Sequence, residues 1–236
     1  MTTPPLDLAV LDMAGTTIDD GLQVYRVLAE TAVAHGASPS AAEIARWHGS
    51  AKHEALRALL TPADGAPPAD DVLRRAVEDF RRRLTAAYLR HPPRPLPGVP
   101  EALAELRAAG VRIALTTGFD REIVDLLLSG LGWTVGSVVD TVVCGSDVPA
   151  GRPAPFMIFR AMEQAGVQDV ARVLVAGDTP RDLRAGTHSG AAFVVGVLDG
   201  ASDADELAAH PHTHILPSVA DLPTLLGVRT ARAAAS

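Results

Sequence analysis

The chain has 236 residues, of which 47% are hydrophobic and 21% are charged, so it can bury a core and does not read as disordered. A net charge of −7 argues against nucleic acid or an acidic membrane surface as a partner, but not against a small anionic substrate held by local cations. The single cysteine, Cys144, excludes an internal disulfide, and Met1 to Pro5 show no signal-peptide pattern. Because no apolar run reaches about 18 residues, we expect a soluble, cytoplasmic protein without a membrane span.

The first predicted element is a buried strand over residues 6–11 that ends at Asp12. Its apolar run is continuous rather than alternating, which is typical of a parallel strand covered on both faces. A carboxylate at the end of such a strand, followed by Gly15 where the backbone must turn, can bind a hard cation or attack an electrophile. The plain alternative is an aspartate that caps a helix or stabilises a turn.

Residues 21–93 have helical periodicity throughout and contain no convincing strand. Helices are expected over residues 23–35, 41–47, 51–60 and 70–90, and a proline-rich stretch over 91–98 cannot continue the last of them. We interpret residues 21–93 as an α-helical cap domain inserted into a core domain made of residues 1–20 and 94–236. Such a cap could open and close over a site.

The rest of the chain alternates apolar strands with amphipathic helices, which predicts a parallel sheet covered on both faces. Strands are expected over residues 111–116, 138–144, 172–176 and 192–197, and helices over 99–109, 121–131, 154–166 and 182–189. The histidines between residues 210 and 214 are expected in a surface loop. The predicted fold class is α/β, a Rossmann-like core with an inserted helical cap, whose ligands should bind at the carboxyl ends of the strands.

Two polar clusters after the later strands can hold an anion. Thr117 and Gly118, with Thr116 as a neighbouring candidate, combine a hydroxyl with backbone N–H groups near the start of a helix. Arg152 lies in a loop constrained by a glycine and two prolines, so its guanidinium is suited to gripping a phosphoryl oxygen. A helix cap and a solvated charge are the respective alternatives.

A third cluster is acidic. Asp178 and Asp182 lie four residues apart across a tight turn, where one carboxylate can bind a metal while the other orients ligands. Each cluster alone could be structural, but the four in this order after successive strands favour one site.

In this order the motifs resemble those of the haloacid dehalogenase (HAD) superfamily: a nucleophilic aspartate, a Ser or Thr, a Lys or Arg, and an acidic pair, with a cap between the first two. The resemblance implies that Asp12 is the nucleophile that forms an aspartyl-phosphate. It implies that Thr117, the Gly118 amide and Arg152 hold the phosphoryl oxygens.

The same resemblance implies a Mg²⁺ cofactor. Asp12, the backbone carbonyl of Ala14 and Asp178 would bind the ion, with Asp182 in support. Most phosphatases of the superfamily carry a second aspartate at the position of Ala14, as general acid for the leaving oxygen. An alanine cannot protonate a leaving alkoxide, so ordinary ester hydrolysis would lose roughly 10²–10⁴-fold here.

Three details closely resemble the phosphonoacetaldehyde hydrolase (phosphonatase) group: the Asp-x-Ala-Gly-Thr-Thr form, the Thr-Thr-Gly of the second motif and the stretch over residues 147–153. That group cleaves a P–C bond after a cap lysine forms an imine with the substrate aldehyde. Lys52 matches its Gly-x-x-Lys pattern and is the only lysine in the chain. A carbon leaving group stabilised as an enamine would need no acid at Ala14.

Four positions differ from the phosphonatase pattern. Met13 replaces a tryptophan, Leu22 a cysteine, Ala55 a histidine and Phe119 a tyrosine, and these changes fall in the substrate pocket. The expected function is Mg²⁺-dependent P–C hydrolysis of phosphonoacetaldehyde or a related small phosphonate. The alternatives are a phosphatase or phosphomutase-like enzyme acting on a small phosphate ester, and a non-catalytic HAD-fold binding module. A cap-mediated homodimer would also be similar to the family.

Overall fold

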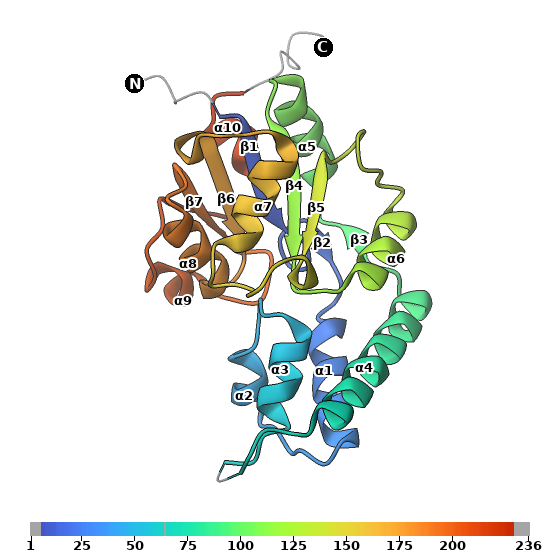
Figure 1. Cartoon of the computed structure of the whole chain (residues 1–236). Helices are drawn as coiled ribbons and strands as arrows, with labels where there is room; N and C mark the ends of the chain where they lie inside the picture. Colours follow the sequence, from blue (N-terminus) through green and yellow to red (C-terminus); the bar gives the residue numbers. More distant parts are fainter. Residues whose placement is uncertain (1–5, 64, 229–236) are drawn as a thin grey trace.

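Six strands form one parallel sheet in the order β5-β4-β1-β6-β7-β8 (Figure 1). The computed structural model describes residues 6–63 and 65–228 of the chain. The strands are β1 (Leu8–Asp12), β4 (Arg112–Thr117), β5 (Thr141–Cys144), β6 (Val173–Gly177), β7 (Phe193–Val197) and β8 (His214–Leu216). The predicted α/β class is confirmed.

Helices cover both faces of this sheet because its central strand is apolar on both sides. Leu8 and Val10 of β1 pack in the cluster that contains α7 and α8 residues, whereas Ala9 and Leu11 pack in the cluster that contains α5 and α6 residues. The helices and short 3₁₀ turns of this part are α5 (Val99–Ala108), α6 (Arg121–Leu131), η1 (Gly145–Asp147), α7 (Phe156–Ala165), η2 (Val170–Arg172), α8 (Pro180–Ser189), α9 (Ala204–Ala208), η3 (Val219–Asp221) and α10 (Leu222–Leu225).

The register of the central strands brings their carboxyl ends to one edge. Asp12 of β1 lies opposite Thr116 of β4, and Leu11 lies opposite Ala176 of β6. Because the strands are in register, the loops that follow β1, β4 and β6 all begin at the same edge of the sheet. This is where the sequence places its reactive side chains.

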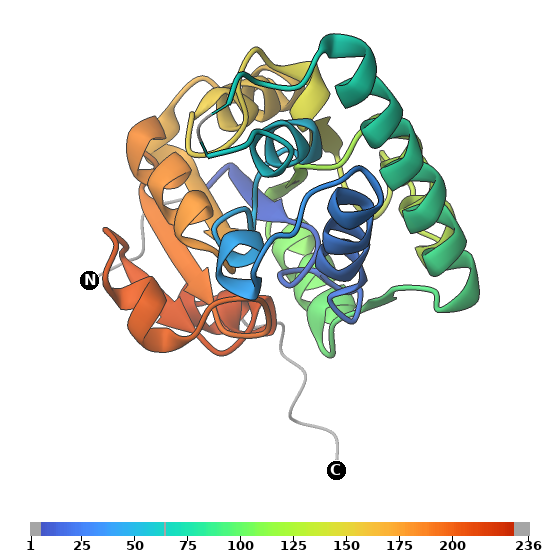
Figure 2. The same ribbon diagram turned by 90° about the horizontal axis from the view of Figure 1, so that it is seen from below.

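The helical segment lies beyond that edge (Figures 1 and 2). Its helices are α1 (Gln23–Ala34), α2 (Ala41–Ala45), α3 (Lys52–Leu59) and α4 (Asp70–Arg90), and we call these four helices the cap. Long α4 packs against α1 and α3 through buried side chains such as Leu84 and Phe80, which belong to the same apolar cluster as Leu11. The cap packs on the sheet edge without an intervening layer. Its boundaries as a separate domain stay an interpretation.

Two short strands join the cap to the rest of the chain, and the sequence did not indicate them. β2 (Ile18–Asp19) and β3 (Arg94–Pro95) pair antiparallel, with Ile18 opposite Pro95 and Asp19 opposite Arg94. A proline lacks the N–H group that a ladder needs, so only a very short pairing is available there. The two linkers therefore run side by side.

Strand β8 corrects one expectation. His214 begins this strand at the edge of the sheet beside Val195 of β7, whereas a surface loop was expected for residues 210–214. The strand has only three half-buried residues, so it lacks the continuous apolar run that marks the inner strands. Every helix in the described ranges is too short or too polar to cross a membrane. The expectations for residues 1–5 fall outside those ranges.

Candidate active site

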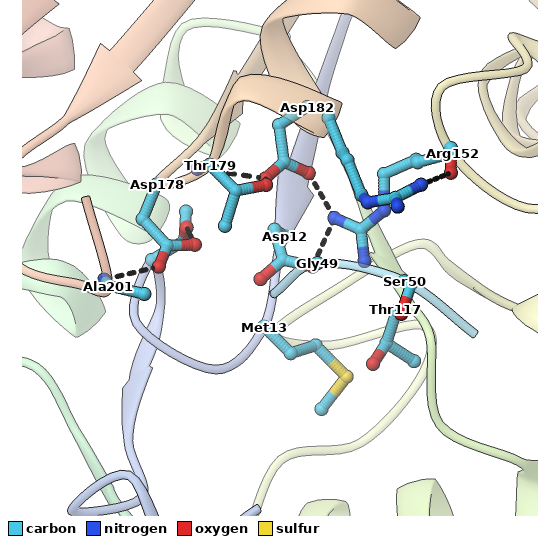
Figure 3. Close-up of polar contacts among 12 residues, drawn as sticks. Asp12, Met13, Gly49, Ser50, Thr117, Arg152, Asp178, Thr179, Asp182 and Ala201 are labelled. Carbon is cyan, nitrogen blue, oxygen red and sulfur yellow. Dashed lines mark hydrogen bonds and ion pairs between the residues drawn. The ribbon is translucent and has the colours of Figure 1, made fainter. Parts of the chain in front are cut away.

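The carboxyl edge of the sheet collects the predicted polar residues in one buried cluster (Figure 3). Asp12 ends β1, Thr117 ends β4 and Asp178 directly follows β6. Arg152 comes from the loop between η1 and α7, and Asp182 from the first turn of α8. All five residues are at most 6% exposed, so the polar atoms of each need a partner inside the protein.

Arg152 provides the positive charge of this cluster. Its Nη1 lies 2.5 Å from Oδ1 of Asp12 and also bonds Oδ1 of Asp182, so the guanidinium lies between the two carboxylates (Figure 3). Burial alone would lower the pKa of Arg152, but these two carboxylates raise it above its usual value. Its buried Nε has no hydrogen-bond partner within the described residues, which leaves one donor for an incoming anion.

Asp178 is held differently. Its Oδ1 accepts a hydrogen bond from the Thr16 hydroxyl (3.1 Å), and its Oδ2 accepts one from the Ala201 amide (2.8 Å). Burial raises the pKa of Asp178 well above the usual range, and the charges of Asp12 and Asp182 raise it further. Across residues 6–63 and 65–228, Asp178 forms no ion pair with a basic side chain. Its negative charge is therefore not balanced by a basic side chain in the described ranges.

Asp182 has both oxygens engaged. Oδ2 accepts hydrogen bonds from the Thr179 amide (3.1 Å) and hydroxyl (2.5 Å) in a capping box at the start of α8, while Oδ1 contacts Arg152. This geometry holds the arginine and the helix start in place. A group of three or more His, Cys, Asp or Glu side chains arranged to hold a metal ion is not found in the described parts of the chain. A metal there would need the backbone as well.

The Thr117–Gly118 turn is the point where core and cap touch. The Thr117 hydroxyl accepts a hydrogen bond from the Phe119 amide (3.2 Å), and the Lys52 amide donates to the Gly118 carbonyl (3.3 Å). A Cβ on Gly118 would overlap the carbonyl of Ser50, so only glycine permits this approach. The glycine that was expected to cradle an anion also permits close docking of α3.

Lys52 is the first residue of α3 and is buried. Its Nζ donates to the carbonyl of Ser50 (2.9 Å) and lies 5.3 Å from the ring centre of Tyr25 and 5.7 Å from that of Phe119. Burial, together with the charge of Arg152, lowers the pKa of Lys52 to about 8, against smaller opposing effects of nearby acids such as Asp12. The amine is thus partly neutral near physiological pH.

A small cavity of about 10 Å³ joins the two sides of the site. Asp12, Thr117 and Arg152 line it from the core, and Lys52 lines it from the cap. Thr116, the neighbouring candidate for the anion-binding hydroxyl, is not part of this lining. The arrangement places the carboxylate of Asp12, the guanidinium of Arg152 and the amine of Lys52 around one space.

Sequence reasoning did not single out Tyr25, which also lines this cavity. Its hydroxyl accepts a hydrogen bond from the Gly49 amide (3.3 Å), and its ring stacks on His48 at 3.9 Å between centres. Burial, with the charge of Lys52, lowers the pKa of His48 to about 4, so this imidazole is neutral. The only signal in the sequence was that Tyr25 lies in the first turn of the first cap helix.

The chain is similar in sequence and in fold to several known proteins. A family profile described as haloacid dehalogenase-like hydrolase matches residues 6–190. A phosphonoacetaldehyde hydrolase of Bacillus thuringiensis (strain Al Hakam) is 31% identical over 208 residues, which cover 84% of this chain and 78% of that protein. A phosphonoacetaldehyde hydrolase-like protein of Syntrophobacter fumaroxidans is 31% identical over 196 residues, covering 79% and 70%.

Solved structures show the same fold. A phosphonoacetaldehyde hydrolase-like protein from Oleispira antarctica superposes with a TM-score of 0.81 at 23% identity, covering 96% of this chain and 94% of that one. A β-phosphoglucomutase from Clostridium difficile superposes with a TM-score of 0.76 at 15% identity, covering 92% and 93%. At these identities the likeness concerns the fold alone.

Proposed function

Since the chain belongs to the haloacid dehalogenase-like hydrolase family, we propose that it hydrolyses the P–C bond of phosphonoacetaldehyde or a related phosphonate. It is an enzyme of the HAD hydrolase type, and its curated relatives at about 31% identity are named phosphonoacetaldehyde hydrolases. The observation that carries the proposal is the shared cavity of Asp12 and Lys52. A carboxylate and a partly neutral amine around one space suit a substrate with a phosphoryl group at one end and a carbonyl at the other.

On the core side, Asp12 attacks phosphorus. Arg152 holds phosphoryl oxygens through guanidinium donors such as its unpartnered Nε, and Thr117 and the Gly118 amide complete the oxygen-binding set. Asp182 keeps the guanidinium aimed at Asp12. Water then hydrolyses the aspartyl-phosphate to inorganic phosphate and restores the carboxylate.

Mg²⁺ fits the acidic side of this site. Asp12 and Asp178 are buried carboxylates whose pKa values burial raises, and a divalent cation beside them would offset that cost. We propose that Asp12, the Ala14 carbonyl and Asp178 hold the ion, with Asp182 in support. When bound, Mg²⁺ would neutralise part of the charge on the phosphoryl oxygens.

On the cap side, the neutral amine of Lys52 adds to the substrate aldehyde, a proton is taken up from solvent and water leaves, which forms an iminium ion. The P–C bond then breaks, the electron pair stays on carbon as an enamine, and phosphorus passes to Asp12. With a pKa of about 8, roughly a tenth of Lys52 is neutral at pH 7. The enamine on Lys52 then takes a proton at carbon, and water releases the aldehyde product and restores the amine. Because the carbon leaves phosphorus as an enamine, no acid is needed at Ala14.

The test is covalent trapping combined with phosphate release. Phosphonoacetaldehyde with Mg²⁺ should release inorganic phosphate, and borohydride should attach the substrate carbon to Lys52, as detected by peptide mass spectrometry. Lys52→Arg, which keeps the charge but cannot form the imine, should abolish both signals. If simple phosphate esters are turned over and that activity survives Lys52→Arg, the enzyme is a phosphatase instead.

Two further properties stay part of this proposal. The lone Cys144 is buried in β5, and burial raises the pKa of its thiol to about 12, which suits a structural residue in a reducing cytoplasm. A homodimer is proposed on the family resemblance, and size-exclusion chromatography with light scattering tests it.

A further inference from the structure

A second cavity lies beside the catalytic one, at the junction of cap and core. Its volume is about 190 Å³, against about 10 Å³ for the cavity that contains Asp12. Residues of α3 and α4 line it from the cap, and the segments that follow β4 and β5 line it from the core. The phosphoryl and imine steps proposed above do not use this space.

The two cavities share the wall residues Lys52, Gly118 and Phe119. These three residues therefore lie between the two spaces. The cavity at Asp12 has a volume of only about 10 Å³ with the cap docked, so most of the open space beside Lys52 belongs to the larger cavity. A substituent on a carbonyl carbon bound to Lys52 therefore has the larger cavity as its adjoining space.

The lining of the larger cavity favours an uncharged substituent. Val77 and Phe80 of α4, Phe119 and Ile123 present apolar surface to it, and three of these four side chains are buried. Lys52 is the only Lys or Arg in the lining. Asp120 is the acid there, and its carboxylate accepts a hydrogen bond from the Ile123 amide at the start of α6. A second anionic group on the substrate would meet this acid and no arginine.

We infer that the larger cavity is a subsite for an apolar alkyl group on the carbonyl carbon of the substrate. The preferred substrates are then 2-oxoalkylphosphonates, R–CO–CH₂–PO₃²⁻, rather than the two-carbon aldehyde. Water adds across the P–C bond to give R–CO–CH₃ and HPO₄²⁻; the electron pair of that bond stays on carbon, which takes a proton, and nothing is oxidised or reduced. This inference rests on the proposed function for its chemistry, but its binding part can be tested without turnover.

The binding test uses saturated n-alkylphosphonates from methyl to hexyl, titrated into the full chain with Mg²⁺ by calorimetry. Each methylene that enters the apolar cavity should lower Kd by about threefold to fourfold, until the cavity is full. Val77→Phe adds a ring at the cavity wall and should remove this gain for the longer chains while leaving methylphosphonate binding unchanged. Val33→Phe is the matched control, because Val33 lies on α1 with 59% of its surface exposed.

A Kd that does not change with chain length overturns the inference. Tighter binding of the longer chains that persists in Val77→Phe overturns it as well. No binding of any member, methylphosphonate included, also overturns it, because the phosphonate end must be anchored. Turnover of phosphonoacetaldehyde, measured in parallel, separates the two proposals: turnover without a chain-length effect leaves the proposed function intact. A chain-length effect without turnover or imine trapping rejects the P–C chemistry and supports the apolar subsite.

The catalytic test compares kcat/KM for phosphonoacetaldehyde and for 2-oxopentylphosphonate. The longer ketone should be favoured by about tenfold or more in the wild-type chain, and Val77→Phe should reverse that order. A wild-type preference for the aldehyde would contradict the assigned substrate class.

Discussion

The two sides of the active site are built on opposite principles. On the core side, Asp12, Arg152 and Asp182 hold one another through direct ion pairs. On the cap side, Lys52 bonds a backbone carbonyl and is otherwise surrounded by aromatic rings such as that of Tyr25. Burial raises the pKa of Asp12 and Asp178 on the core side and lowers that of Lys52 on the cap side. In the proposed function the core side binds the phosphoryl group and the cap side selects the substrate.

The largest expected effect separates the two sides directly. Asp12→Asn removes the proposed nucleophile, so phosphate release should fall by roughly 10⁴–10⁶-fold. Lys52 is untouched, and borohydride trapping of the substrate aldehyde should continue. Release is measured by a phosphate assay and trapping by mass spectrometry. Activity within tenfold of wild type would show that Asp12 is not the nucleophile, provided that circular dichroism confirms folding.

The contact between the two sides can be disturbed without altering either set of reactive groups. Gly118→Ala would place a methyl group against the Ser50 carbonyl and push α3 away from the core, so kcat/KM should fall by about 10–100-fold. Gly130→Ala is the control, because a Cβ at Gly130 in α6 meets nothing within 4 Å. Equal activity of the two variants would contradict the close docking of α3 on this turn.

The pH dependence of imine formation should be set by Lys52 on the cap side. Only the neutral amine attacks an aldehyde, so the rate of cyanoborohydride trapping should rise about tenfold per pH unit below the Lys52 pKa of about 8 and level off above it. The rate is followed by intact-mass spectrometry at saturating aldehyde. A midpoint near the usual lysine value of 10.5 would mean that Lys52 is solvated rather than buried.

The smallest effect concerns stability. The pKa of Lys52 is lower in the folded chain than in the unfolded one, so between about pH 8 and 10.5 the unfolded chain binds more protons, and stability should rise with pH over that window. Below pH 8 the buried charge opposes folding. Lys52→Met should therefore raise the free energy of unfolding at pH 7 by roughly 2–3 kcal/mol. Urea unfolding measures it, and a variant less stable than wild type would contradict the burial cost.

Much of the core could be predicted from sequence because its signals are local. Helix α6 was expected over its observed bounds: Asp120 caps its start by accepting from the Ile123 amide, and Gly132 ends it in a left-handed conformation. Asp12 and Asp178 were predicted as site residues because each lies at the end of an apolar strand, and the structure buries both at the same sheet edge. Strand β8 was missed because three half-buried residues leave no such pattern.

The cap side of the site was less predictable, because it depends on how distant segments dock. Lys52 was found only through its motif and its uniqueness. The stacking of Tyr25 on His48 joins residues 23 positions apart, and the larger cavity exists only where α4 meets the segment after β4. Periodicity places each helix but does not indicate which side chains meet across the interface.

The antiparallel pairing of β2 and β3 determines where the cap is connected to the rest of the chain. Because Asp19 and Arg94 are partners, the polypeptide leaves for the cap and returns from it at one point. On the domain boundaries that we propose, the cap could be exchanged through this single point of connection, or replaced by a two-residue turn such as Asn-Gly, which suits a hairpin. Exchange of this module between related chains would transfer substrate choice while the phosphoryl machinery stayed in place.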